Sequence, residues 1–161
     1  MSKARKDGWA PIHIACQNGR LGSIEVLCDH GIDANVRVAD EVGNTPAIIS
    51  SMNGHVKCLA LVSDRGADQN LANSDGYTAV HKACQHGHLK CIFILVSRRA
   101  DLNKKNIYGH TPLDIARMFK QRECVDLLLA NGAVGMSVED LPPVPEDIKV
   151  CMSASFIRSF V

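Results

Sequence analysis

Between residues 73 and 103, short apolar runs and polar turns follow one another in a fixed order, and the rest of the chain repeats this order. A turn at Ser74-Asp75-Gly76 precedes a short apolar run, residues 79–83, and a second break follows at His86-Gly87-His88. A denser apolar run then covers residues 92–96. Glycine clusters mark turns, and short apolar runs between them suit helices that pack against a neighbour. The stretch therefore predicts a helix–turn–helix unit.

The same outline occurs four times, so the chain is a repeat array. The turn glycine recurs in steps of 35, 33 and 33 residues, at Gly8, Gly43, Gly76 and Gly109. The glycine of the middle break recurs at Gly19, Gly54 and Gly87, with Lys120 in the fourth copy. The closing position of each copy holds Gly31, Gly66, Arg99 and Gly132. At this last position a left-handed backbone is expected, also for Arg99.

The residues after each turn glycine carry a resemblance to a known family. They read Ala10-Pro11-Ile12-His13, Thr45-Pro46-Ala47-Ile48, Thr78-Ala79-Val80-His81 and Thr111-Pro112-Leu113-Asp114. This resembles the ankyrin repeat, with its pattern G-x-T-P-L-H-x-A, a G-H break, an apolar helix and G-A-D-x-N. The resemblance covers roughly 130 of the 161 residues. It implies an all-α solenoid of helix–turn–helix units joined by β-hairpin fingers.

The chain divides into three parts. A polar lead, residues 1–7, precedes four repeats in residues 8–134, and residues 135–161 form a proline-containing linker and a possible C-terminal helix. The approximate bounds of the repeats are 5–37, 38–71, 72–104 and 105–134. The fourth repeat has a polar stretch at its middle break and resembles the C-terminal capping copies of the family.

The first repeat has the pattern of an interior repeat, without a capping helix ahead of it. An uncovered repeat face is apolar, so solenoids normally cap both ends. We therefore expect another element to cover this face, and the apolar positions of the C-terminal segment are the most able to do so: Ile148, Met152, Phe156 and Phe160.

Two irregularities interrupt the pattern. The connection between the first two repeats, residues 36–42, is two residues longer than the others. It is either a tolerated loop insertion or a functional loop. In the second repeat, Ala47 and Ile48 depart from the family pattern and Ser50 and Ser51 replace small apolar residues. We expect its first helix to pack less tightly than those of the neighbouring repeats.

Charge and cysteine content narrow the class of partner and the compartment. Eighteen basic and 17 acidic residues leave a net charge of +1, and the only basic cluster is Lys3, Arg5 and Lys6. This argues against a nucleic-acid partner, and no apolar run reaches the ~20 residues of a membrane helix. Three of the seven cysteines, Cys58, Cys91 and Cys124, recur in steps of 33. Helices packed 8–10 Å apart hold such a column beyond disulfide reach, so we expect reduced core thiols and a cytoplasmic or nuclear protein.

No catalytic, cofactor or metal site is expected. The segment from Cys84 to Cys91 resembles a metal-ligand cluster, but His88 fills the G-H position and Cys91 belongs to the cysteine column. Structural zinc needs four convergent ligands. The family resemblance implies that His13 and His81 bond to neighbouring backbone, and no nucleophile accompanies them. The last three residues, Ser159-Phe160-Val161, match the carboxyl-terminal ligands of PDZ domains.

The resemblance implies that the protein is not an enzyme but an adaptor, scaffold or inhibitor, which binds a partner protein through a concave face and the fingers. After the turn glycines, this surface contains Trp9, Asn44, Tyr77 and His110. The ends of the first helices add Gln17, Asn18, Met52, Asn53, Gln85, His86, Met118 and Phe119. The finger tips add Glu41, Val42, Asp75, Ile107 and Tyr108.

Aromatic residues are concentrated on this surface. Four of the seven in the chain belong to it, namely Trp9, Tyr77, Tyr108 and Phe119. Aromatic side chains are preferred anchors of protein interfaces. We therefore expect alanine at Tyr77 or Tyr108 to weaken binding and leave stability almost unchanged.

Two alternatives stay open. The array could be the regulatory or substrate-recruiting part of a longer enzyme, such as a kinase or a ubiquitin ligase. It could also be a stand-alone kinase inhibitor, since the cyclin-dependent-kinase inhibitor family has about four such repeats.

Overall fold

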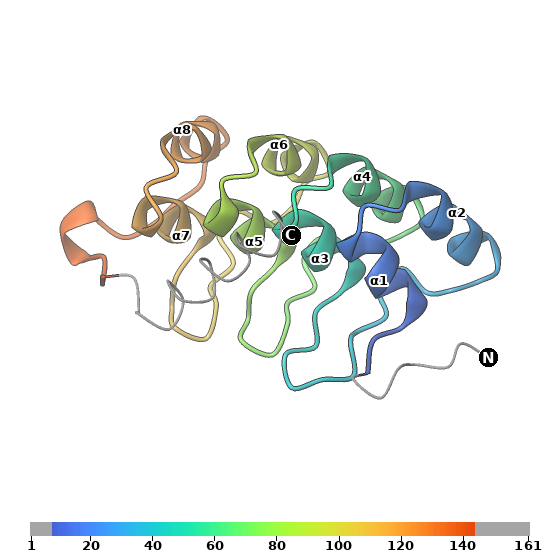
Figure 1. Cartoon of the computed structure of the whole chain (residues 1–161). Helices are drawn as coiled ribbons and strands as arrows, with labels where there is room; N and C mark the ends of the chain where they lie inside the picture. Colours follow the sequence, from blue (N-terminus) through green and yellow to red (C-terminus); the bar gives the residue numbers. More distant parts are fainter. Residues whose placement is uncertain (1–7, 144–161) are drawn as a thin grey trace, which may run out of the picture.

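A computed structural model describes residues 8–143, and in this range eight α-helices form four stacked pairs. The pairs are α1 (Pro11–Gln17) with α2 (Leu21–Asp29), α3 (Pro46–Met52) with α4 (Val56–Asp64), α5 (Ala79–His86) with α6 (Leu89–Ser97), and α7 (Pro112–Met118) with α8 (Arg122–Ala130). The first helices form one layer and the second helices the other (Figure 1). A 3-10 turn, η1 (Val138–Asp140), follows α8. The predicted all-α solenoid is confirmed.

Two predictions concern residues outside this range. The polar lead, residues 1–7, and the segment 144–161 are not among the described residues. The proposed cover by Ile148, Met152, Phe156 and Phe160 therefore stays a prediction, as does the PDZ-type terminus at Ser159-Phe160-Val161.

The first helix of each repeat begins at the residues that follow the turn glycine, because these residues satisfy backbone N–H groups that have no partner within the helix. Proline occupies the first helical position of α1, α3 and α7, where its missing N–H loses no helical hydrogen bond. The Thr45 and Thr111 hydroxyls cap α3 and α7 by accepting from backbone N–H groups three residues later. The Asp114 carboxylate accepts from the Thr111 N–H at 2.8 Å. The T-P-L-H stretch thus works as an N-terminal capping sequence.

Two buried histidines join this cap to the neighbouring finger. The His81 Nδ1 accepts from the Thr78 N–H at 3.1 Å, and its Nε2 lies 3.2 Å from the His110 carbonyl oxygen in the next repeat. His13 makes a similar pair of contacts. Its Nδ1 accepts from the Ala10 N–H at 3.0 Å, and its Nε2 lies 2.9 Å from the carbonyl oxygen of Val36, at the start of the first finger. Burial lowers the pKa of both rings, and the pKa of His81 falls to about 4. The neutral rings therefore hold helix starts and fingers together.

A second histidine ladder joins the repeats at the middle breaks. The Nε2 atoms of His55 and His88 lie 3.0 and 3.1 Å from the carbonyl oxygens of Gln17 and Met52 in the preceding repeats. A Cβ added at Gly54 would lie 2.7 Å from the His88 ring, so side chains are excluded there. The fourth repeat has no described repeat stacked behind it, which explains why Lys120, with φ 56°, is accommodated at the equivalent position.

The fingers reverse direction without becoming strands. In each finger a backbone hydrogen bond closes the turn, as from the Asn73 N–H to the Tyr77 carbonyl at 3.0 Å, and the second and third fingers add one within the turn, as from the Gly76 N–H to the Asn73 carbonyl at 3.0 Å. One further bond reaches the preceding finger, as from the Ser74 N–H to the Val42 carbonyl at 2.9 Å. So few bonds cannot form a continuous ladder. No residue between 8 and 143 is in a β-strand, so the fingers follow a hairpin course without strand pairing.

The core lies between the two helix layers and continues from repeat to repeat. Among the first helices, α3 of the second repeat is buried most completely, contrary to the expectation from its irregular sequence. Every residue of α3 from Pro46 to Ser51 is buried. Ala47, Ser50 and Ser51 are small enough for α1 and α5 to approach from both sides. Loose packing was therefore the wrong prediction for this helix.

The cysteine column lies in this core. Cys58, Cys91 and Cys124 are at most 2% exposed, and all six described cysteines are free thiols. Burial raises the pKa of Cys91 to about 11 and the pKa of Cys16 to about 12. These thiols pack as small apolar groups, and their thiolate forms are disfavoured.

Arg99→Gly is expected to stabilise the protein by about 1 kcal/mol, because Arg99 has a left-handed backbone with φ 59° that favours glycine. Gly132→Ala is the matched control: this glycine has φ 79° and open space around an added Cβ, so alanine there should be destabilising by a similar amount. Urea unfolding followed by circular dichroism measures both changes. An Arg99→Gly variant less stable than wild type would show that the arginine side chain makes a stabilising contact that outweighs the strain.

Candidate protein-binding surface

The finger tips and the ends of the first helices form the predicted binding surface. The fingers between successive repeats extend from the same side of the array (Figure 1), so their tips form a row. Ile107 and Tyr108, at the tip of the third finger, are 64% and 60% exposed. Val42, at the tip of the first, is 38% exposed, and Glu41 beside it is exposed as well. Large apolar groups held this far into solvent suit contact with another molecule.

The helix ends contribute a mixed polar and apolar margin. Gln17, Asn18 and Asn53 are exposed, and the Asn18 and Asn53 amides donate to carbonyls one helical turn earlier. The more apolar members of the set are half-buried: Met52, Met118 and Phe119. Phe119 is also the C-cap of α7, so the chain itself fixes its position.

Positions after the turn glycine are covered to very different extents. Trp9, Asn44 and His110 are half-buried. Trp9 meets the His13 ring edge-on with centroids 6.0 Å apart, while His110 stacks with Tyr108 at 6.4 Å. The Asn44 Oδ1 accepts from the Asn73 amide at 3.0 Å. These side chains serve the fingers' own packing as well as any surface.

Tyr77 and Gln85 are buried, which corrects their prediction as exposed contact residues. Tyr77 is only 6% exposed, and its ring meets the His81 ring edge-on with centroids 5.7 Å apart. The Lys82 ammonium lies 4.3 Å from the centre of the same ring. Gln85 is likewise 6% exposed and accepts from this ammonium at 3.0 Å. Tyr77 is therefore a core residue of the third repeat, and truncating it will affect stability.

The long first finger is braced rather than loose. The Asp40 carboxylate accepts from the N–H groups of Val42 and Gly43 at 3.0 and 2.6 Å. The Arg37 guanidinium donates to the Ala72 carbonyl at 2.6 Å and so reaches the second finger. Sequence reasoning did not identify Arg37 as a bridge, because the repeat pattern does not specify the residue at this position, which is Ala72 in the next connection.

The charge along the row of fingers changes sign. The first finger presents Asp40 and Glu41, and the second presents the half-buried Asp75. The third presents Lys105, exposed next to the apolar tip. At the middle of the surface, burial and the nearby Lys82 and His88 lower the pKa of His86 to about 4. His86 is therefore neutral at pH 7, and its ring stacks on that of His88 with centroids 6.0 Å apart.

The histidines and cysteines considered for metal binding or catalysis are engaged in packing. Within residues 8–143 no three or more His, Cys, Asp or Glu side chains come together as a metal site. His88 contacts the Met52 carbonyl, and burial raises the pKa of Cys84 well above its usual value. In the same range no helix is long and apolar enough to cross a membrane.

The fourth repeat ends in a segment that folds back on α7, a feature beyond the reach of sequence reasoning. The Met136 N–H donates to the Asp114 carboxylate at 2.6 Å, and the Arg117 guanidinium donates to the Met136 carbonyl. Asp114, the residue that replaces histidine in the T-P-L-H pattern, therefore serves two backbone segments. This explains physically why the last repeat tolerates the replacement.

Comparisons with known proteins agree with this architecture. The family described as "Ankyrin repeats (3 copies)" matches residues 1–73 and again 60–139. The E3 ubiquitin-protein ligase KEG of Arabidopsis thaliana is 29% identical over 82 residues, which are 50% of this chain and 5% of the ligase. The palmitoyltransferase AKR1 of Kluyveromyces lactis is 32% identical over 76 residues, 47% of this chain and 10% of that protein.

A smaller relative is protein phosphatase 1 regulatory subunit 27 of Mus musculus. It is 35% identical over 69 residues, 43% of this chain and 44% of the subunit. The chain thus spans less than half the length of each of these relatives. Stacked helix pairs with a row of fingers define a repeat solenoid of the protein-interaction class. The chain belongs to the ankyrin repeat family, whose repeats are non-catalytic protein-binding modules.

Proposed function

We propose that this protein is a non-catalytic binding module, an adaptor, scaffold or inhibitor that holds a partner protein against its finger tips and concave helix ends. The exposed pair Ile107 and Tyr108 is the observation that carries the proposal. Neither side chain is needed inside the core, and an exposed ring of this kind is a preferred interface anchor. Phe119 and Val42 extend the apolar area toward the two ends of the array.

The charge of the fingers supports a partner with a matching pattern. A basic group of the partner would meet Glu41 on the first finger, and an acidic group would meet Lys105 on the third. An apolar group beside that acidic group would contact Tyr108, which lies on the same finger as Lys105. Such complementarity sets the orientation and the rate of association more than the affinity.

Alanine at the exposed anchors should weaken partner binding more than tenfold, because loss of an interface hot spot typically costs about 2 kcal/mol or more. Partners captured with the intact chain are identified by mass spectrometry, and their Kd is then measured for Tyr108→Ala and Phe119→Ala. Lys57→Ala and Lys90→Ala are the controls, since both lysines are exposed on second helices, α4 and α6.

The outcome separates the concave surface from the C-terminal segment. Unchanged binding by the two aromatic variants, with binding lost on deletion of residues 141–161, would assign recognition to that segment and reject the proposal. Loss of binding by the lysine controls, with binding by the two aromatic variants unchanged, would place the contact on the opposite side.

A second candidate is the regulatory or substrate-recruiting part of a longer enzyme. The ligase and the palmitoyltransferase favour it, because in both the aligned repeats are a small share of a much longer protein. A natural transcript that joins these repeats to a kinase or ligase domain would support this candidate. We further propose a cytoplasmic or nuclear location on the basis of the free buried thiols.

A further inference from the structure

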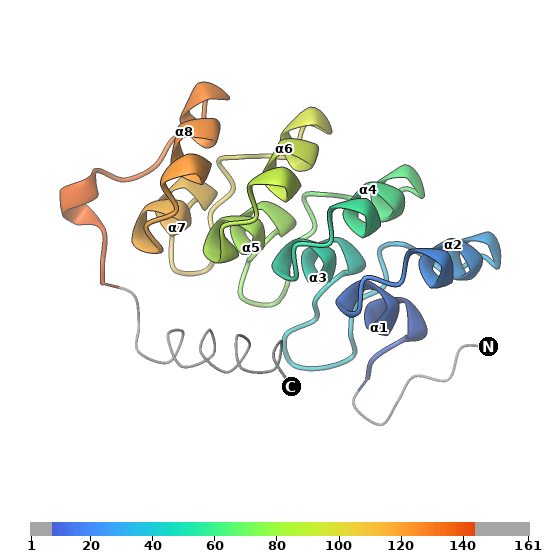
Figure 2. The ribbon, with the colours of Figure 1, turned by 45° about the horizontal axis from the view of Figure 1, so that its top comes forward.

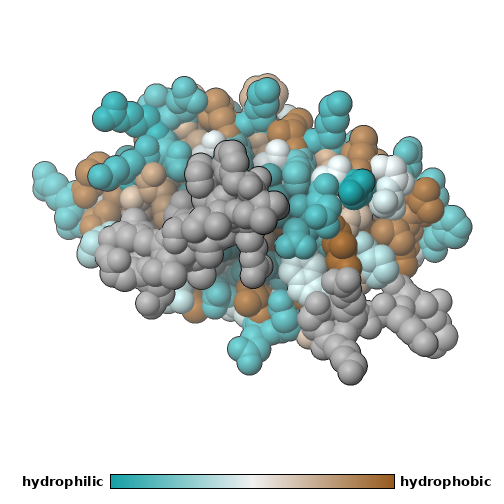
Figure 3. Space-filling model, in the orientation of Figure 1, coloured by the Kyte–Doolittle hydropathy of each residue, from teal (hydrophilic) through white to brown (hydrophobic). Residues whose placement is uncertain are grey.

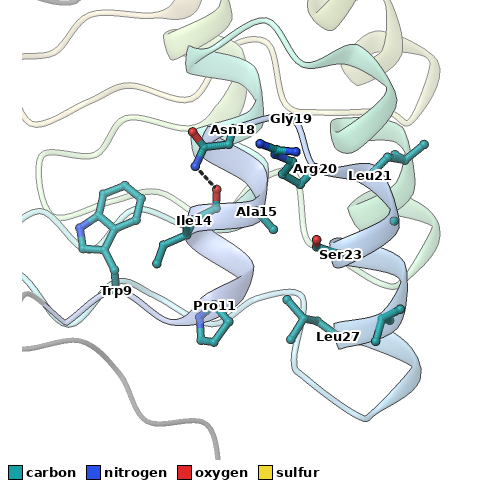
Figure 4. Close-up of a pocket in the computed structure, with 12 residues that line it drawn as sticks. Trp9, Pro11, Ile14, Ala15, Asn18, Gly19, Arg20, Leu21, Ser23 and Leu27 are labelled. Atoms are coloured by element: carbon teal, nitrogen blue, oxygen red, sulfur yellow. Dashed lines mark hydrogen bonds between the residues drawn. The ribbon is translucent and has the colours of Figure 1, made fainter. Parts of the chain in front are cut away.

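The outer face of the first repeat is an open apolar groove, distinct from the proposed binding surface. Its volume is about 1210 Å³, and it lies between α1 and α2. Figure 4 shows Trp9, Pro11 and Ile14 on the α1 side and Leu21 and Leu27 on the α2 side. In the space-filling view, brown apolar surface is present at this end of the array (Figure 3).

Equivalent residues in the other repeats are covered by the preceding repeat. Leu21 and Val26 are 38% and 57% exposed, whereas their counterparts one repeat later, Val56 and Leu61, are partly buried and pack on the core. The same holds for α1. Ile14 is half-buried, but the equivalent Ile49 is fully buried. The groove is therefore the surface on which a preceding helix pair would stack.

Polar groups at the rim of the groove also occupy positions whose equivalents in the later repeats bind the preceding repeat. Arg20 is equivalent to His55 and His88, whose rings reach back to a carbonyl at the end of the previous first helix. It is exposed at the start of α2 and lines the groove (Figure 4). Among the described residues, Arg20 therefore has no preceding first helix whose carbonyl it could bind as His55 and His88 do.

Two more positions complete the set. His30 is equivalent to Arg65 and Arg98, which pair with Asp29 and Asp64 of the preceding repeats, the latter pair at 2.6 Å. Asp33 is equivalent to Asp101, whose backbone N–H donates to the Asn70 side chain of the preceding repeat at 2.7 Å.

We propose that this groove is a stacking site for one further ankyrin-type helix pair supplied by a partner. The partner pair would offer a backbone carbonyl to Arg20, a carboxylate to His30 and an amide side chain to the Asp33 N–H. Its apolar face would cover Leu21 and Val26. Repeat 2 of this chain already presents that set of acceptors to repeat 3, through the Met52 carbonyl, Asp64 and Asn70.

The two ends of the array differ in a way that favours this occupant over a head-to-tail second copy. At the far end, residues 133–141 follow α8 and lie beyond the last helix pair (Figure 2). The contacts of Met136 with Asp114 and Arg117 hold this segment on α7. A second copy would have to displace it before its fourth repeat could enter the groove.

The test presents the partner chemistry by fusion, which raises its effective concentration to the millimolar range. A copy of residues 43–75 is inserted directly before Gly8 of the full chain, so that its closing Asp75 precedes Gly8 as Asp75 precedes Gly76. The inserted copy has no aromatic residue, and Trp9 is the only tryptophan of the protein. Trp9 lines the groove, so its emission reports directly whether the groove is covered.

Stacking should raise Tm by about 5 °C or more, because each repeat adds an interface to a solenoid. It should also shift the Trp9 emission to shorter wavelength, reduce its quenching by acrylamide and protect the inserted residues from protease. Val26→Glu is the matched control. In the parent chain this exposed position should tolerate the change, whereas in the extended chain it should abolish the gain in Tm and the Trp9 shift.

Three results would overturn the proposal. The first is an inserted copy that the protease digests rapidly, while acrylamide quenches Trp9 as strongly as in the chain without the insertion. The second is a parent chain that doubles in mass with concentration and buries Trp9, because the occupant is then a second copy. The third is a parent chain in which deletion of residues 144–161 exposes Trp9, because the occupant is then the C-terminal segment.

Discussion

Lowering the pH from 7 to 4.5 is expected to reduce the free energy of unfolding by about 2.5 kcal/mol through His81 alone. Burial is the main cause that lowers the pKa of this ring from 6.5 to about 4. In the unfolded chain the ring takes up a proton below about pH 6.5, but the folded protein resists protonation until about pH 4. The stabilisation from the neutral ring is therefore complete above pH 6.5 and is lost progressively as the pH falls to about 4.

A comparison of variants isolates this effect from the titration of the carboxylates. His81→Asn should be less stable at pH 7, since asparagine cannot bridge Thr78 and His110, but its stability should fall less steeply between pH 6.5 and 4. His30→Asn is the control for the loss of a histidine elsewhere in the chain, because His30 is exposed and caps the C-terminal end of α2. Urea titrations at several pH values give the slopes. Equal slopes for His81→Asn and wild type would mean that His81 is protonated in the folded protein.

The fold was predictable because one local pattern determines each unit. The turn glycines, the Pro and Thr of the capping sequence and the apolar runs act within a few residues, so their spacing alone locates the helices. The left-handed backbone at Arg99 follows from the same equivalence, because Gly31, Gly66 and Gly132 share its position and have φ of 79–92°. Residues that lie one repeat of about 33 residues apart therefore share their backbone conformation as well as their place in the helix pair.

Side-chain burial at the fingers was less predictable. Residues after the turn glycine share one backbone position, yet Trp9 is half-buried and Tyr77 is buried. The difference arises from neighbours that the repeat pattern does not constrain, above all Lys82, whose ammonium lies 4.3 Å from the centre of the Tyr77 ring. The fold-back of Met136 onto Asp114 likewise depends on a contact between residues 22 apart, and Met136 lies outside the repeats.

Tyr77→Ala is expected to reduce the free energy of unfolding by about 3 kcal/mol, in the range for removal of a buried aromatic ring. The ring is 6% exposed and packs against His81 and Lys82, so alanine leaves a cavity in the third repeat. Tyr77→Phe keeps the ring and should lower stability by about 1 kcal/mol or less, the usual net value of one hydrogen-bonding group. Tyr108→Ala removes a ring that is 60% exposed and should stay within about 0.5 kcal/mol of wild type.

Urea unfolding of the three variants ranks them directly. If Tyr77→Ala were as stable as Tyr108→Ala, the Tyr77 ring would not be part of the core, and its use as an exposed binding anchor would again be plausible. The expected ranking also determines how a binding experiment is interpreted. A cavity beside His81 loosens the bridge to the His110 carbonyl and so disturbs the finger that carries Tyr108. Loss of partner binding by Tyr77→Ala would therefore follow from either a direct contact or a displaced finger, and only variants that keep the native Tm locate the contact surface.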